Sequence, residues 1–441
     1  MRKSNDLARL RRHACLITLL AGGLLSCSRE GSPVDVEVAS RTGEPAGEVA
    51  GSTTSAGGRG LWVLAEGSVR VLDDPERIPR LIQRALELDV SDLFVQVYRG
   101  GRVFYPTDFE IEAASIAGAD PEIDAFGSLI EAAHGNGIRV HAWVNVLSLS
   151  TRRDANLIEE LGPEAVLVDR YGRSILDYPG LEVPEPDRRY YRMGTRGIYL
   201  DPAVPEVRER LLALFRDLVE RYPDLDGLHL DYIRHPGVLP FTPGSRFGVG
   251  LDFGYGVVSR SRYRAETGQP DPIEDAPAGT VRGASRWDDW RRKQVTALVE
   301  SIAATSRAAR PDLVLSAAVI SYVDRAYLTL AQDWRGWLES GAIDLAIPMV
   351  YTLDDRLFRY QLEGFAGSAL ADRIWPGVGV WLFDRNPARA LRQLDLLSQS
   401  GFAGEVLFSD DAIAASPALR SALADAAPIR SSSDADTASG R

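Results

Sequence analysis

Cysteine is scarce in this sequence, in which only Cys15 and Cys27 occur among 441 residues. Basic residues near the start, such as Arg2 and Lys3, precede a short apolar run at 14–25. This order is typical of a secretory signal, and the run is too short for an ordinary transmembrane helix. Because Cys15 lies in the signal, we expect no disulfide in the mature domain, although an exported protein could form one.

The end of this signal contains a second pattern. Residues 24–27 (Leu-Leu-Ser-Cys) resemble the lipobox of bacterial lipoproteins. The resemblance implies removal of residues 1–26 and attachment of a lipid to Cys27, which would anchor the protein to a membrane. A soluble exported protein with an ordinary cleavage site nearby is the alternative. Ser28 stands where an inner-membrane retention signal would have aspartate, so we expect a bacterial outer-membrane protein that faces the periplasm.

An excess of basic residues is also lacking, since the formal net charge is -12. General nucleic-acid binding requires a basic face, so we expect no nucleic-acid partner. The sequence has no HExxH pattern, no G-x-S-x-G elbow at a strand end and no Gly-rich phosphate loop after its first strand. We therefore expect neither a cofactor nor a metal ion. A metal site formed by His141, His229, His235 and Asp231 stays open as an alternative.

The chain divides by composition into a tether, a domain and a tail. Residues 27–58 are rich in Gly, Ser, Thr, Ala and Glu and are expected to form a flexible tether, and residues 428–441 a disordered tail. Between them, residues 59–427 alternate apolar strand segments with amphipathic helices. The predicted strands are 60–64, 92–98, 138–145, 226–232, 313–320, 343–351, 374–382 and 404–409.

Eight strands that alternate with helices predict an α/β fold with a parallel sheet, most simply a (β/α)₈ TIM barrel. The alternative is an open doubly wound sheet. Helices are expected at 75–89, 124–136, 205–221, 286–309, 331–340, 356–370 and 387–400. Long insertions follow the third and fourth strands, and they contain many aromatic and basic residues. Because both follow a strand, we expect them at the catalytic face and suited to an extended substrate.

The fourth predicted strand contains the principal candidate for catalysis. Leu228 and Leu230 share one parity and should face the helices, so His229 and Asp231 should point into the barrel. Asp231 would then lie nearer the carboxyl-terminal mouth, with His229 beneath it. A carboxylate is costly to bury without a partner, which favours a functional role or an ion pair with Arg234 or Arg99.

Other strands are expected to bring polar and aromatic side chains to the same mouth. Aromatic rings stack on the apolar faces of sugars while polar groups bind their hydroxyls, and Trp143, Tyr351 and Trp381 are the candidates for stacking. The predicted substrate-binding residues are Gln96, Tyr98, Arg99, His141, Trp143, Asn145, His229, Arg234, Tyr351 and Trp381.

Glycoside hydrolysis normally requires two carboxyl groups, of which one is a general acid with a raised pKa. Asp231 is the first candidate. The second carboxylate is left open by the sequence, with candidates at Glu66, Asp108, Asp354, Asp355, Asp384, Asp410 and Asp411.

Four segments of the domain contain characteristic motifs: 132–145 (AAHGNGIRVHAWVN), 200–208 (LDPAVPEVR), 226–236 (DGLHLDYIRHP) and 333–351, which begins with DWR and ends with PMVY. These motifs resemble those of one known family, the glycosyl-hydrolase-like family 10. The resemblance covers nearly all of 59–427 in order. Two departures are Asp201, where the family usually has Asn, and Met349, where it usually has Gln, which points to a changed substrate preference.

The resemblance implies a TIM barrel and glycoside hydrolase activity, with Asp231 as the acidic residue of the strand-four motif. His141, Trp143, Asn145, His229 and Tyr351 would fill the other motif positions. The family includes bacterial lipoproteins, which suggests a polysaccharide partner in the envelope, such as peptidoglycan glycan strands. The alternatives are a catalytically silent glycan-binding lipoprotein and a metal-dependent polysaccharide hydrolase or deacetylase.

Overall fold

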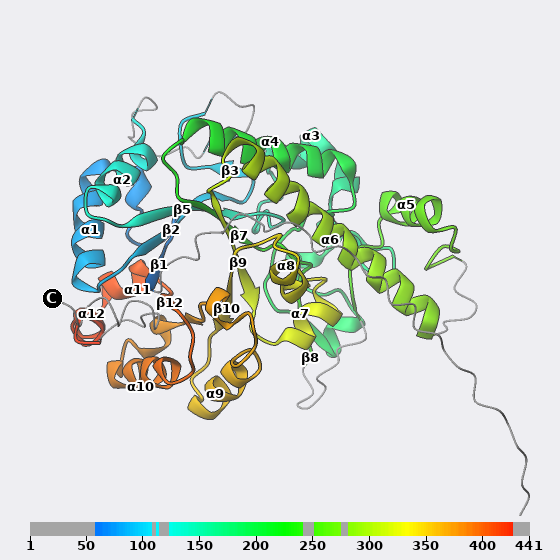
Figure 1. The fold of residues 1–441 in the computed structure, drawn as a ribbon. Helices are drawn as coiled ribbons and strands as arrows, with labels where there is room; N and C mark the ends of the chain where they lie inside the picture. Colours follow the sequence, from blue (N-terminus) through cyan, green and yellow to red (C-terminus); the bar gives the residue numbers. More distant parts are fainter. Residues whose placement is uncertain (1–57, 108–111, 114–122, 241–250, 275–280, 427–441) are drawn as a thin grey trace, which may run out of the picture. The chain divides into compact units, whose positions relative to one another are not determined.

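The computed structural model describes residues 58–107, 112–113, 123–240, 251–274 and 281–426 (Figure 1). The predicted signal at 1–26, the tether at 27–58 except its last residue, and the tail at 428–441 lie outside this part of the chain. Cys27, the predicted site of lipidation, therefore lies outside it as well.

Eight parallel strands form a closed barrel. β1 pairs with β2 on one side and with β12 on the other, and this double pairing closes the sheet in the order β1-β12-β11-β10-β9-β7-β5-β2. The predicted TIM barrel is thus confirmed, and the alternative of an open doubly wound sheet is excluded. The strands are β1 (Arg59–Val63), β2 (Asp92–Arg99), β5 (Arg139–Asn145), β7 (Gly227–Asp231), β9 (Val314–Ile320), β10 (Leu345–Val350), β11 (Gly377–Val378) and β12 (Glu405–Leu407).

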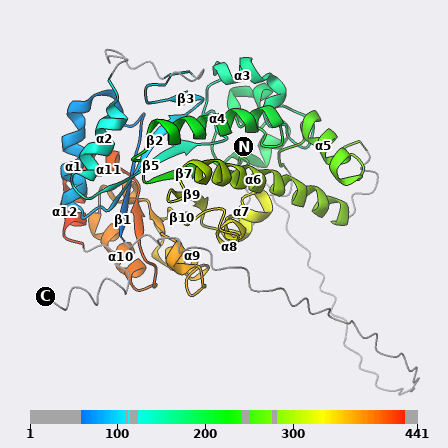
Figure 2. The ribbon, with the colours of Figure 1, turned by 45° about the horizontal axis from the view of Figure 1, so that its top comes forward.

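Helices follow most strands and cover the outside of the barrel. They are α1 (Ile78–Glu87), α2 (Ala125–His134), α4 (Pro205–Arg221), α6 (Val281–Ala309), α7 (Val323–Thr329), α8 (Trp334–Glu339), α9 (Asp355–Glu363), α10 (Pro387–Ser398), α11 (Asp410–Ala415) and α12 (Pro417–Ala424). Figures 1 and 2 show α4 and α6 side by side. In the described residues, none of these helices combines the length and apolar composition that a membrane span requires.

Local sequence signals explain several boundaries. Pro205 begins α4 as its first residue, where the missing N–H costs nothing, and the predicted range 205–221 matches. The side chain of Asp124 accepts a hydrogen bond from the amide of Gly127 and caps α2. The predicted strand at 374–382 is wrong over most of its length. Only Gly377 and Val378 form a strand, because a 3-10 helix (Val380–Phe383) follows closely, and Ile374 forms an isolated bridge with Ala346.

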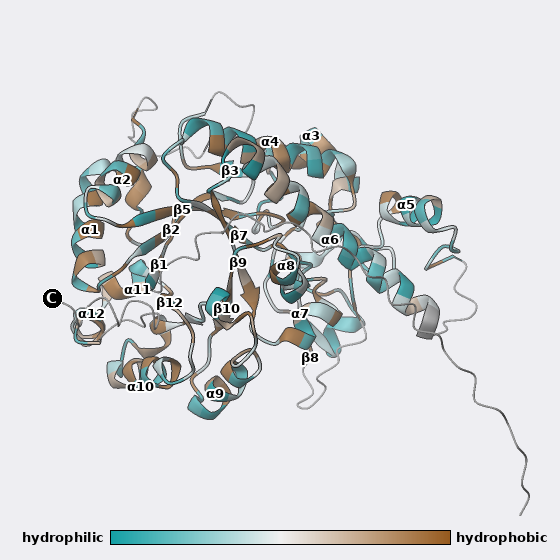
Figure 3. Ribbon diagram, viewed as in Figure 1, coloured by the Kyte–Doolittle hydropathy of each residue, from teal (hydrophilic) through white to brown (hydrophobic). Residues whose placement is uncertain are grey.

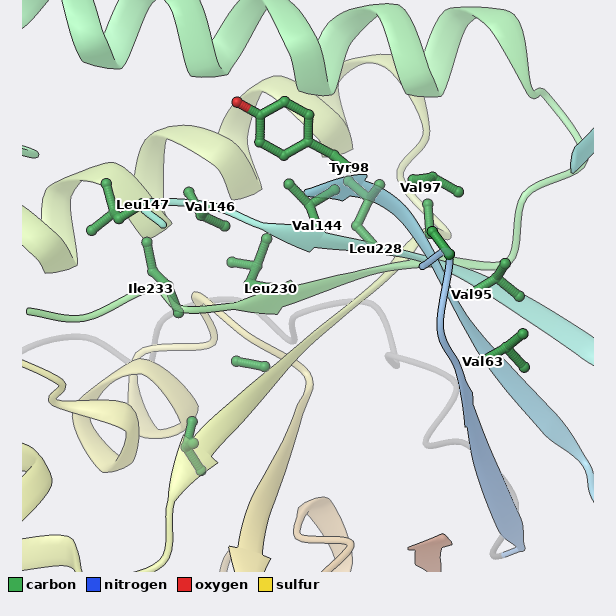
Figure 4. Packing of buried hydrophobic residues seen from close by; sticks show 14 of the residues in the cluster. Val63, Val95, Val97, Tyr98, Val144, Val146, Leu147, Leu228, Leu230 and Ile233 are labelled. Atoms are coloured by element: carbon green, nitrogen blue, oxygen red, sulfur yellow. The ribbon is translucent and has the colours of Figure 1, made fainter. Parts of the chain in front are cut away.

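The apolar side chains separate into an outer and an inner cluster. The outer cluster lies between strands and helices, and Figure 4 shows Val144, Leu228 and Leu230 among its residues. The helices carry a hydrophobic and a hydrophilic side, as Figure 3 shows. A smaller cluster fills the barrel and includes Trp62 and Trp143. This division confirms the predicted parity of the fourth strand.

The two long insertions pair with each other. The first contains α3 (Asn156–Leu161) and β6 (Tyr191–Met193), and the second contains β8 (Val238–Pro240) and α5 (Val257–Thr267). β6 and β8 form a small antiparallel sheet, a pairing that the sequence did not predict. β3 (Arg102–Val103) and β4 (Glu112–Ala113) extend the barrel sheet beside β2.

Candidate active site

Asp231 is the last residue of β7, and its carboxyl group is buried at the carboxyl-terminal end of the barrel. The indole Nε1 of Trp143 donates to Oδ2 at 3.2 Å, and the backbone amide of Tyr232 donates to Oδ1 at 2.6 Å. Tyr232 adopts a positive φ of 51°, which is uncommon for a residue with a side chain. Such backbone strain is found preferentially at functional sites, and here it holds a donor against the carboxyl group.

Burial raises the pKa of Asp231 to about 6. The guanidinium of Arg234 and the hydrogen bonds from Tyr232 and Trp143 act in the opposite direction, since they stabilise the carboxylate. Arg234 is itself buried and acts on Asp231 electrostatically, but the two side chains form no ion pair within 4 Å in the described residues, so the alternative of an ion pair stays a prediction. A carboxyl group with a pKa near neutrality can both hold and release a proton under physiological conditions.

His229 lies one layer below Asp231, where its ring is fully buried. Trp62 donates from Nε1 to the Nε2 atom of His229 at 3.0 Å, so the proton of the neutral ring is on Nδ1. That atom lies 2.9 Å from Oγ of Ser316, and burial lowers the pKa of His229 well below its usual value. Both ring nitrogens are therefore occupied, and His229 supports the site from beneath. Its predicted role in substrate binding stays a prediction.

His141 lies nearer the amino-terminal end of the barrel. Its Nε2 atom is 2.9 Å from Oδ1 of Asp92, and its ring stacks on Phe94 with 4.7 Å between centroids. His235 is buried separately, beyond the end of β7. Within the described residues, no three His, Cys, Asp or Glu side chains are grouped so that they could hold a metal ion. The three histidines of the alternative metal site, His141, His229 and His235, thus lie in different environments and are not grouped around one point.

Gln96 and Asn145 form a polar pair beside Asp231. Asn145 is the register partner of Asp231 in the β5–β7 ladder, and it accepts a hydrogen bond of 3.2 Å from Nε2 of Gln96. Oε1 of Gln96 accepts from the amide of Ala65, 3.4 Å away. The structure thus brings Gln96, Asn145 and Asp231 together as predicted from strand parity.

Tyr98 is a correction. The sequence placed it inward with Gln96, but the β2–β5 ladder shifts register between these two residues. The irregularity turns Tyr98 outward, where it is buried in the outer cluster (Figure 4). Arg99 follows, and its guanidinium forms an ion pair of 3.3 Å with Glu66. A β-bulge has no clear signature in the sequence of one strand, so strict alternation wrongly predicts that Tyr98 faces the same side as Gln96.

Tyr351 and Trp381 lie close together at the mouth. Gly379 is located between them, because a Cβ atom there would lie 3.1 Å from the ring of Tyr351 and 3.2 Å from Nε1 of Trp381. Trp381 is 48% exposed, as a surface for sugar stacking would be. Tyr351 is half-buried and lies close enough to Asp231 for the carboxylate to raise the pKa of its phenol further.

A pocket of about 310 Å³ opens at this mouth. It is bounded by the ends of β9 and β10, by α7 and α9, and by the β6–β8 sheet of the insertions. Its lining includes Arg234, Tyr322, Arg325, Met349, Tyr351 and Gln361. Tyr322 and Arg325 were not predicted. Their position directly after the fifth strand is the signal that could have indicated them.

The predicted second carboxylates are distributed over different places. Asp108 lies outside the described residues. Asp410 is buried against Arg84 and Asp354 caps α9, which gives both a structural function. Asp355 lies near Arg389, Asp384 accepts from the amide of Arg385, and Asp411 accepts from Ser68 and Val69. Glu66 follows β1 at the mouth, with Arg99 and Arg102 as ion-pair partners.

Residues 58–363 match the family model described as Glycosyl hydrolase-like 10. The chain belongs to this family. Glycosyl hydrolase DigH of Escherichia coli is 24% identical to this chain over 384 residues, which cover 79% of this chain and 76% of DigH. Glycosyl hydrolase YngK of Bacillus subtilis is 22% identical over 309 residues, 66% of this chain but only 51% of YngK.

A solved structure shows the same fold. A GH42 β-galactosidase from G. stearothermophilus superposes with a TM-score of 0.53 and 11% identity, over 83% of this chain and 56% of that one. At this identity the likeness shows the barrel alone. The family match and the named relatives identify this chain as a glycosyl hydrolase-like enzyme, and the family implies that its substrate is a glycan.

Proposed function

We propose that this protein hydrolyses O-glycosidic bonds of an envelope polysaccharide, namely peptidoglycan glycan strands, with Asp231 as the proton donor. The observation that carries the proposal is the buried Asp231 carboxyl group, whose pKa is raised to about 6 and which interacts electrostatically with Arg234 and Tyr351 of the pocket lining. The export signal expected from the sequence supports the choice of an envelope glycan as the substrate. The exposed ring of Trp381 would support a sugar chain.

The first step would use Asp231 in its protonated form. The carboxyl group donates its proton to the glycosidic oxygen as the bond to the anomeric carbon breaks, and the leaving sugar departs as an alcohol. Trp143, Tyr232 and Arg234 stabilise the carboxylate that remains. Water completes the hydrolysis at the anomeric carbon. Glu66, at the mouth after β1, is one of the candidates that the sequence left open for the second carboxylate, and its participation is part of this proposal.

A panel of glycans tests the function. The full-length protein is incubated with purified peptidoglycan glycan strands, chitin oligosaccharides and β-linked glucans, and the products are analysed by mass spectrometry. We expect shortened oligosaccharides from the strands. Binding without any cleavage would contradict the proposal and support the silent glycan-binding alternative.

The pH dependence of the reaction should respond to Arg234. A general acid must be protonated, so kcat/KM should fall as the pH rises through the pKa of Asp231, about 6. Because the guanidinium of Arg234 lowers that pKa, Arg234→Gln should move the basic limb to higher pH by about one unit. Arg356→Gln is the control, since its side chain is 92% exposed on α9. An unmoved limb in R234Q, or one moved to lower pH, would contradict the assignment.

We also propose that a lipid on Cys27 anchors the protein to the outer membrane, facing the periplasm. The lipobox-like sequence at 24–27 supports this proposal. Cys27→Ala should move the protein from the membrane fraction to the soluble fraction, and mass analysis of the wild-type amino terminus should show a lipid on Cys27. A wild-type chain that carries no lipid there would refute the anchor.

A further inference from the structure

The pocket beside Asp231 has an unusual charge for this molecule. The chain contains 62 acidic residues against 50 basic ones, yet the described residues that line the pocket include two arginines and no acidic side chain. Arg234 comes from the segment after β7, and Arg325 comes from α7. Figure 1 shows α7 close to β8, which also lines the pocket. The pocket is thus a local positive site in a negative protein.

Many other arginines among the described residues have carboxylate partners. Arg59 pairs with Glu405 at 2.8 Å, and Arg84 pairs with Asp410 at 2.7 Å. No such ion pair within 4 Å occurs for the two pocket arginines among the residues that the structure describes. Arg234 is 6% exposed, and its buried Nε atom has no hydrogen-bond partner there. A buried guanidinium with an unused donor is costly unless a ligand satisfies it.

We propose that Arg325, together with Arg234, binds the carboxylate of an acidic sugar and so determines substrate specificity. This inference rests on the proposed hydrolase function and names the sugar that occupies the pocket. A planar guanidinium matches a carboxylate in a bidentate arrangement, which is stronger than a neutral hydrogen bond. The volume of about 310 Å³ is at the small end of the range for ligand sites and suits one sugar ring with its substituent.

The neighbouring side chains fit this assignment. Tyr322 and Gln361 provide polar groups for hydroxyls, and the ring of Tyr322 lies 5.8 Å from the guanidinium carbon of Arg325. Tyr351 lines the same pocket and is electrostatically coupled to Asp231. A sugar carboxylate held in the pocket would therefore position the adjoining glycosidic bond toward the proton donor.

Arg325 is the residue to change, because Arg234 also acts on the Asp231 carboxyl group. Binding is measured by calorimetry for wild-type protein, Arg325→Gln, Arg325→Lys and the exposed control Arg356→Gln. The probes are oligosaccharides of peptide-free muramic acid strands, the same strands with their carboxylates converted to amides, and oligogalacturonate. The first and last probes separate a lactyl ether carboxylate from a ring carboxylate.

We expect the wild-type protein to bind at least one carboxylate probe about tenfold or more tightly than the amide. Arg325→Gln should remove that preference, Arg325→Lys should restore part of it, and Arg356→Gln should leave it intact. Equal affinity for acid and amide in the wild-type protein, or an undiminished preference in Arg325→Gln, would overturn the proposal. Because binding is the readout, a preference without any turnover would refute the hydrolase function and leave this inference standing.

Discussion

Asp231→Asn should lower kcat on glycan strands by about 10³-fold or more while leaving substrate affinity nearly unchanged. The amide has the shape of the carboxyl group and keeps one oxygen that can accept a hydrogen bond from Trp143 or Tyr232, while its NH2 group faces the other donor. It cannot donate a proton to the glycosidic oxygen. The effect should therefore appear in kcat, which is measured from initial rates of reducing-end release.

Asp312→Asn is the matched control, because Asp312 is a 72% exposed carboxylate before β9, at the opposite end of the barrel from Asp231. Its activity should equal that of the wild-type protein. Near-normal turnover in Asp231→Asn, with the fold verified by circular dichroism, would remove Asp231 from the mechanism. Loss of binding together with loss of turnover would instead assign Asp231 to substrate recognition.

The same substitution should stabilise the protein at neutral pH. Burial raises the pKa of Asp231 from 3.8 to about 6, so the folded protein holds a proton that the unfolded chain has released between these values. Above about pH 6 the carboxylate is ionised in both the folded and the unfolded protein, and its burial lowers the free energy of unfolding by about 3 kcal/mol. An amide carries no charge and avoids this cost. The loss of one of the two hydrogen bonds to the carboxylate offsets part of this gain, so Asp231→Asn should be more stable by about 1–2 kcal/mol at pH 7.

The sign of the pH dependence provides the check. The advantage of Asp231→Asn should shrink as the pH falls from about 6 toward about 4, because the wild-type carboxyl group is then protonated in the folded state. Urea unfolding of both proteins at several pH values measures this difference. A variant that is less stable than wild type at pH 7 would show that the carboxylate is well stabilised in place, contrary to the raised pKa.

Periodic features of the fold could be predicted from the sequence, and interactions between distant segments could not. The α4 range and the inward orientation of Asp231 follow from local signals and strand alternation. Tyr98 was misplaced because a register shift in β2 reverses the alternation. The β6–β8 pairing joins two insertions far apart in sequence, and neither contains a pattern that names its partner.

The site shows the same division. Residues on barrel strands, such as Trp143 and Asn145, lie beside Asp231 as their parity predicts. Arg325 lies on α7 beyond a strand end, and only the folded chain shows that it faces the pocket. The hydrogen bond from Trp62 to His229 also crosses the barrel between segments with no common motif. Side chains that meet through loops and across the barrel require the structure.

Digestion of purified peptidoglycan glycan strands in ¹⁸O-labelled water tests the central claim most directly. The account predicts that wild-type protein produces shorter strands with one labelled oxygen for each cleaved bond, at the new reducing end, and that Asp231→Asn produces almost none. Intact strands after prolonged incubation with folded wild-type protein, or equal product from Asp231→Asn, would contradict it.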